Sequence, residues 1–113
     1  MLFRSFAADH ALDGGGLANF SVSVASVSAL AALGIYYVPK VDRTTYVYHS
    51  RGVTAGSMRG YGTLQTMTAL EVQVDEICRE LPLDPIEFRR RNALATGNRT
   101  TAGNPYVDRK SVV

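Results

Sequence analysis

The sequence predicts an α+β fold in which short strands precede a long amphipathic helix and a second, shorter helix. Three patterns support this class. Apolar residues recur at helical spacing over residues 63–81, a segment with helix-start signals follows at 85–93, and β-branched and aromatic residues cluster over 44–50. With 113 residues, 46% of them hydrophobic, the chain is long enough for one domain or part of a larger one, and its composition excludes a disordered chain.

Two strands are expected in the first half of the chain. Residues 6–12 are a short apolar segment, which we interpret as a strand closed by the Asp-Gly-Gly-Gly turn of residues 13–16. Residues 35–38 should be extended, because Pro39 disfavours a helix in the residue before it. Residues 44–50 are then expected to form the second strand.

The segment between these strands, residues 20–33, has an ambiguous pattern. Its first residues alternate as in a strand, whereas its second part is rich in alanine and leucine, which favour a helix. Asn19 as the N-cap and Gly34 just past the end decide for a helix. The apolar stretch is too short to cross a membrane, so we expect a buried element and no membrane span.

The clearest element is the helix expected over residues 63–81. Its apolar face carries residues at steps of three or four, namely Leu64, Met67, Leu70, Val74, Ile77 and Leu81. Cys78 lies beside this stripe and is expected to be a small core residue. A proline ends the helix, and the next one starts with Asp84 as N-cap, Pro85 in the first turn and Glu87 three residues after the cap.

A glycine-rich loop, Ser57-Met58-Arg59-Gly60-Tyr61-Gly62, leads directly into the long helix. Glycines allow a close backbone approach, and the first amides of a helix, with its dipole, favour an anionic ligand. Arg59 adds a fork of donors for phosphate or polar heteroatoms. The loop therefore predicts an anion-binding site. The structural alternatives are a surface or turn-stabilising Arg59 and a Tyr61 that packs in the core.

Several other polar residues have both a functional and a structural interpretation. Glu71 and Asp75, one helical turn apart, are candidates for acid–base chemistry or a metal site, but we favour a solvated face with an Asp75–Arg79 ion pair. Glu71 borders the apolar face, and burial against a loop amide is its alternative. His10 and His49 lack the spacing of metal ligands and are expected on a strand surface or in the core.

The two ends of the chain affect the charge argument. Residues 1–5 and 108–113 match what a common short-read sequencing adapter encodes on its two strands, so we expect the genuine segment to be residues 6–107. Setting these ends aside leaves nine of the twelve basic and nine of the ten acidic residues, a net charge of about zero in place of +2. A segment taken from a larger domain should expose apolar surface and have low stability alone.

The remaining charges give no sign of a nucleic-acid partner. The run Arg89-Arg90-Arg91 spreads over different helix faces, and nearby acids balance it (Glu80, Asp84 and Glu87), which predicts a solvated face. The single cysteine excludes an internal disulfide. We expect a cytoplasmic location, with the periplasm as the alternative.

With the loop and both helices placed, residues 57–94 resemble the molybdopterin-binding large subunit of the xanthine dehydrogenase and aldehyde oxidase family. That family carries an R-G-F/Y-G-x-x-Q loop, a helix with an E-x-x-x-D-E pattern, and then D-P-x-E-x-R-x-x-N. The matching residues here are Arg59, Gly60, Tyr61, Gly62, Gln65, Glu71, Asp75, Glu76, Asp84, Pro85, Glu87, Arg89 and Asn92. Residues 13–15 and 37–39 match the same family more loosely.

The resemblance implies a molybdenum hydroxylase, an oxidoreductase that hydroxylates an aldehyde or N-heteroaromatic carbon with oxygen derived from water. Its cofactor would be molybdopterin, in the plain or a dinucleotide form, and the dithiolene of the pterin rather than protein side chains would hold the metal. The implied partners are a small-molecule substrate and subunits or domains that carry 2Fe-2S clusters and FAD.

Carried over residue by residue, the family's loop implies that Arg59 lies beside the molybdenum centre and that Tyr61 faces the substrate. Met58, Gly60 and Gly62 would then contact the cofactor.

Two departures from the family limit this assignment. The general base of the family, a glutamate, is expected beyond the last residue of this chain, so we assign no catalytic residue here and expect no activity from the chain alone. Val27 stands near the position of an arginine that orients purines, which argues against xanthine as the substrate. The alternative is a non-catalytic structural or assembly module, and a glycine-flanked glutamate downstream in the reading frame would distinguish the two.

Overall fold

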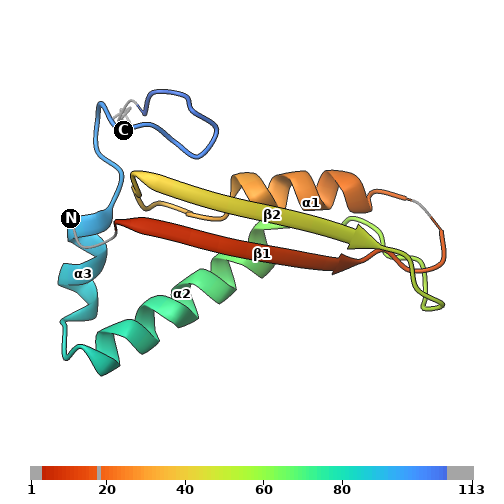
Figure 1. Ribbon diagram of the computed structural model, residues 1–113, viewed down its shortest axis with the longest axis horizontal. Coiled ribbons are helices and arrows are strands. Elements are labelled where there is room, and N and C mark those ends of the chain that lie inside the picture. The colour runs from red at the N-terminus through yellow and green to blue at the C-terminus, as the bar shows by residue number, and fades with distance from the viewer. Residues whose placement is uncertain (1–3, 18, 107–113) are drawn as a thin grey trace.

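The computed structural model describes residues 4–17 and 19–106. The elements follow the order β1 (Ser5–Asp13), α1 (Ser21–Leu30), β2 (Lys40–Tyr48), α2 (Thr63–Glu80) and α3 (Pro85–Asn92). β1 and β2 pair in parallel, with α1 in the connection between them, and α1 and α2 lie on the same side of the two strands (Figure 1). The α+β class is confirmed.

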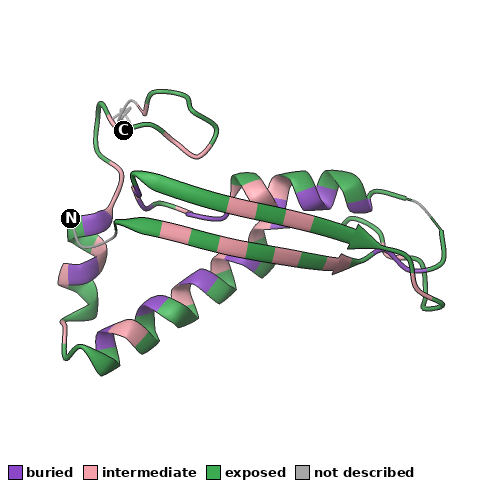
Figure 2. Cartoon of the chain, viewed as in Figure 1, coloured by how far each residue is buried: buried purple, intermediate pink, exposed green. Residues whose placement is uncertain are grey.

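The two strands are covered on one face and open on the other. Their register runs from Ser5 opposite Lys40 to Asp13 opposite Tyr48. Alternate residues of β1 are half-buried and the others exposed, and neither strand has a fully buried residue (Figure 2). β2 begins four residues before the predicted strand and excludes His49 and Ser50. The pairing with β1 sets these bounds, and local propensity could not reveal it.

α1 confirms the predicted helix but not its predicted caps. The helix begins after Phe20, which makes no side-chain capping bond, so the assignment of Asn19 as N-cap is wrong. It ends at Leu30, and further turns follow before Gly34, where φ is 54°. The amide of Gly34 donates a 2.9 Å bond to the carbonyl of Ala31. The helix is therefore positioned by its packed face, because no side chain caps its start.

α2 supplies three of the five residues of the main core cluster. Its buried residues recur every fourth position, at Thr66, Leu70, Val74 and Cys78. Three of them join a cluster with residues from other segments, which comprises Tyr36, Leu70, Val74, Cys78 and Phe88. The predicted core role of Cys78 is confirmed. The predicted apolar face is right in the middle of the helix and wrong at its ends, since Leu64 is 65% and Leu81 59% exposed where no other element covers them.

α3 starts as predicted. Oδ1 of Asp84 accepts a 2.7 Å bond from the amide of Glu87, and Pro85 occupies the first position. At its other end the chain pairs with the extended segment before β2. The amide of Tyr37 donates to the Asn92 carbonyl at 2.8 Å, and the amide of Leu94 donates to the Ile35 carbonyl at 2.8 Å. The predicted extended segment at 35–38 thus holds the end of α3.

Most of the residues that we interpret as adapter, 1–3 and 108–113, lie outside the described part of the chain, so that hypothesis stays a prediction. Among the described helices, none has the combination of length and apolar character that a membrane crossing requires.

Candidate functional site

The glycine-rich loop packs directly on α1 before it enters α2. Gly60 and Gly62 have φ angles of 78° and 74°, a region that side chains disfavour. A Cβ at Gly62 would lie 2.4 Å from the carbonyl oxygen of Val24 and 2.7 Å from the amide of Ser28. The positive φ and the close approach to α1 both require glycine at position 62. This residue therefore determines the loop conformation and the packing of the loop on α1.

The start of α2 differs in one respect from the anion-binding site that the sequence predicts. Gly62 is the N-cap of the helix, and the amide of Leu64 donates a 3.1 Å bond to the Gly60 carbonyl. One of the early amides expected to be free is therefore used within the loop itself. The helix start therefore has fewer free amides for an anion than the sequence predicts.

A pocket of about 160 Å³ opens beside the loop, and the predicted site residues Met58, Arg59, Gly60 and Tyr61 line it. Gly62 faces α1 instead and is absent from the lining. The Met58 side chain is 84% exposed. Arg59 is exposed and has no hydrogen-bond or ion-pair partner within residues 4–17 and 19–106, so its guanidinium is available to a ligand.

A second pocket of about 230 Å³ shares Val24, Gly56 and Gln65 with the first. Ser21 at the start of α1 also lines it. The Oγ atom of Ser21 is buried and has no hydrogen-bond partner among the described residues. Asp13 lies across from it, and hydrogen bonds from the Gly15 amide and the Ser50 hydroxyl lower the pKa of its carboxyl. The two pockets adjoin each other between the loop, α1 and α2, and both combine a mostly apolar lining with a few polar side chains.

Phe20 adjoins this site through its contact with Tyr61, which no sequence pattern indicates. Its ring lies edge-on to Tyr61, with the ring centroids 6.4 Å apart and the planes at 73°. The contact brings together residues from the start of α1 and from the loop before α2. No local pattern marks Phe20, because the contact depends on the way the loop folds back over α1. Tyr61 is half-buried rather than part of the core cluster.

The carboxylates of α2 form a structural network with α3. Glu71 accepts a 2.7 Å bond from the Tyr36 hydroxyl and a 3.0 Å bond from Nε of Arg89. These partners replace the loop amide that was the alternative to a solvated face. Asp75 pairs with Arg89 at 2.7 Å, which replaces the predicted pair with Arg79. Both carboxylates raise the pKa of Arg89. The sequence could not indicate this network, because the guanidinium comes from the next helix.

The arginine run of α3 is structural, as predicted. Arg90 and Arg91 both pair with Glu87, and their hydrogen bonds lower the pKa of that carboxyl to about 2. Elsewhere, Nδ1 of His10 lies 3.4 Å from the Ser28 hydroxyl, and Nδ1 of His49 lies 3.2 Å from the Gly15 carbonyl. In the described part of the chain, no group of three or more His, Cys, Asp or Glu residues is arranged to hold a metal ion.

Comparisons with known proteins identify the family of this chain. The chain belongs to the molybdopterin cofactor-binding domain family, which its residues 3–93 match. It is 32% identical over 103 residues to a xanthine dehydrogenase molybdenum-binding subunit of Escherichia coli, with 83% of this chain and 13% of that protein covered. It is 28% identical over 91 residues to the nicotinate dehydrogenase large molybdopterin subunit of Eubacterium barkeri, with 80% and 21% covered.

Solved structures show the same fold. The aldehyde oxidoreductase of Desulfovibrio desulfuricans superposes with a TM-score of 0.86 at 24% identity, over 90% of this chain and 11% of that one. The Desulfovibrio gigas enzyme gives a TM-score of 0.74 at 26% identity, over 89% and 11%. The chain thus corresponds to a small part of the large subunits to which it is related.

Proposed function

We propose that this chain forms one wall of the molybdopterin site in the large subunit of a molybdenum hydroxylase. The observation that carries the proposal is the placement of Arg59, an exposed arginine without a described partner, in one pocket with Tyr61. Arg59, with Met58 and Gly60, would contact the cofactor, and Tyr61 would face the substrate, while Gly62 would hold the loop against α1.

The residues present fit such a cofactor. Pterins and their phosphates offer acceptors for the planar guanidinium of Arg59. Gly60 has no side chain, so its backbone is accessible in the pocket. A Cβ at this position would lie 3.4 Å from the side chain of Leu64. When bound, the cofactor supplies the two-electron chemistry that hydroxylates an electron-poor carbon. The chain's own contribution is to bind and orient the reactants.

Tyr61 is the residue best placed to select the substrate. Its ring is held by Phe20 on one side and lines the pocket on the other. A ring fixed in this way offers an edge or face for packing and a hydroxyl for hydrogen bonding. Aldehydes and N-heteroaromatic compounds suit both properties, and the names of the related proteins include an aldehyde oxidoreductase and a nicotinate dehydrogenase. We propose these two classes as substrates.

Electron transfer would require partners. A further relative, 34% identical over 71 residues, is a subunit of a dehydrogenase complex in Paenarthrobacter nicotinovorans, with 63% of this chain and 9% of that protein covered. We propose iron–sulfur and flavin subunits or domains as the partners of the intact protein.

A second candidate is a non-catalytic module that keeps the loop for packing. The packing of Gly62 against α1 favours this second candidate, because that contact alone would maintain the loop conformation. The reading frame beyond residue 113 separates the two: a hydroxylase requires a glycine-flanked glutamate downstream.

The functional test is the molybdenum and pterin content of the purified intact subunit, assayed with an aldehyde and an N-heteroaromatic substrate. A subunit that carries neither molybdenum nor pterin would refute the hydroxylase.

A further inference from the structure

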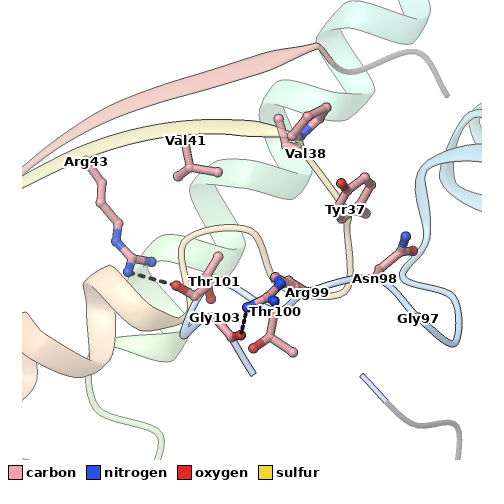
Figure 3. A pocket seen from close by; sticks show the side chains of 11 residues that line it. Tyr37, Val38, Val41, Arg43, Gly97, Asn98, Arg99, Thr100, Thr101 and Gly103 are labelled. Carbon is pink, nitrogen blue, oxygen red and sulfur yellow. Dashed lines mark hydrogen bonds between the residues drawn. The ribbon is translucent and has the colours of Figure 1, made fainter. Parts of the chain in front are cut away.

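A further cavity in the described part of the chain lies away from the glycine-rich loop. Its volume is about 480 Å³, within the range of small-molecule sites. One wall is the segment from Tyr37 to Arg43, which leads into β2, and the other is the turn-rich segment from Gly97 to Gly103 (Figure 3). This cavity shares no lining residue with either pocket beside the glycine-rich loop, so it is a separate site.

Two arginines, one from each wall, line the cavity. Arg43 of β2 donates to the carbonyl of Thr101 in the second wall at 3.1 Å (Figure 3) and to the carbonyl of Ala29 on α1 at 2.6 Å. Arg99 donates to the Gly103 carbonyl at 3.2 Å. A guanidinium has five N–H donors. Within the described residues, these bonds use two donors of Arg43 and one of Arg99, so both retain donors for a ligand.

The cavity contains no compensating negative charge. None of the described residues that line it is acidic. Asp42 is the acid nearest in sequence, but it alternates to the other face of β2 and lines a different hollow with Asp9. Two positive charges without a carboxylate favour an anion, and guanidinium groups match phosphate and carboxylate oxygens in geometry.

The same cavity also offers apolar surface. Val38 is buried at its floor, and Pro39, Val41 and the ring of Tyr37 continue the wall beside it. A simple inorganic ion would leave most of this volume unused. The lining therefore suits a small organic molecule with an anionic group at one end.

We propose that this cavity binds a small organic oxyanion, with its phosphate or carboxylate between Arg43 and Arg99 and its apolar body against Val38 and Val41. The site does not depend on molybdopterin and belongs to a second ligand. Phosphate and carboxylate share the required chemistry, and the test distinguishes them.

Isothermal titration calorimetry on the intact subunit tests the proposal with phenyl phosphate, benzoate and the uncharged benzyl alcohol. Phenyl phosphate or benzoate should bind, and the stronger of the two identifies the group. Arg99→Gln should weaken that binding by about tenfold or more, which is the loss of one charge-assisted contact. Arg99 is exposed, so this change spares the core, and Arg51→Gln in the loop after β2 is the matched control.

Three results would overturn the proposal. The first is the absence of binding by both anions. The second is equal binding of benzyl alcohol, which would show that charge is irrelevant. The third is an equal loss of affinity in Arg99→Gln and Arg51→Gln, which would show that the anion responds only to net charge.

Discussion

The hydroxyl of Tyr36 donates a 2.7 Å hydrogen bond to the carboxylate of Glu71. Tyr36 lies in the extended segment before β2 and is 2% exposed, whereas Glu71 lies on α2. Arg89 of α3 binds the second oxygen of the same carboxylate. One carboxylate therefore joins three segments around the core cluster and fixes the position of α2, whose first turn continues the glycine-rich loop.

Removing the Tyr36 hydroxyl should destabilise the fold. Tyr36→Phe deletes a part-buried bond to a charged acceptor, and we expect a loss of about 1.5–3 kcal/mol in the free energy of unfolding. Chemical denaturation measures this loss. Tyr46→Phe on the open face of β2, where the side chain is 55% exposed, should change stability by no more than about 0.5 kcal/mol. Equal effects of the two substitutions would show that the Tyr36 bond has no special role.

Alkaline pH should destabilise the protein through the same tyrosine. Burial, followed by the bond to Glu71, raises the pKa of Tyr36 from 10.0 to about 12. Because the unfolded state loses this proton first, the stabilisation is complete below pH 10 and is lost as pH rises from about 10 to 12. Tyr36→Phe should reduce the slope of stability against pH in this range. An unchanged slope would contradict the assignment.

The two loop glycines should differ in their tolerance of alanine. Gly60→Ala would place a methyl group against only the flexible Leu64 side chain, so we expect a cost of about 1–3 kcal/mol from the backbone conformation. Gly62→Ala adds a clash with the Val24 carbonyl and should cost clearly more. Thermal unfolding of both variants compares them, and equal melting temperatures would show that the loop does not seat on α1 as described.

Tyr61→Phe tests the substrate side of the proposed site. The change removes a hydroxyl at the pocket but keeps the ring against Phe20, so molybdenum content should stay the same while substrate preference shifts. The measurement is kcat/KM across aldehydes and N-heteroaromatic compounds. A loss of one hydrogen bond predicts a change of about 2–12-fold for substrates that use it. Identical kinetics across the panel would exclude Tyr61 from the substrate pocket.

The sequence predicted the parts of this fold that local patterns determine. The long helix, the cap at Asp84 and the turn after β1 follow from periodicity and from side chains that bond within three residues. It did not predict the parallel pairing or the true start of β2. The two strands are separated in the sequence by α1, so no local pattern indicates that they pair.

The same distinction holds for the site. Met58, Arg59, Gly60 and Tyr61 are consecutive, so one motif predicted a group that the structure places around one pocket. Phe20 and Ser21 come from a distant segment and are brought in only by folding. Arg89 was likewise matched to the family motif, but its bonds to Glu71 and Asp75 depend on the packing of α3 on α2.

The most direct test of the central claim is the molybdenum occupancy of the intact subunit when Arg59 is replaced. In Arg59→Ala, loss of the guanidinium at the pocket should lower molybdenum content or turnover by about 10–100-fold. Arg51→Ala, an exposed arginine of the same loop region outside the pocket, should leave both unchanged. Metal analysis with a turnover assay gives both values. Full molybdenum content with unchanged turnover in Arg59→Ala would contradict the role proposed for this loop.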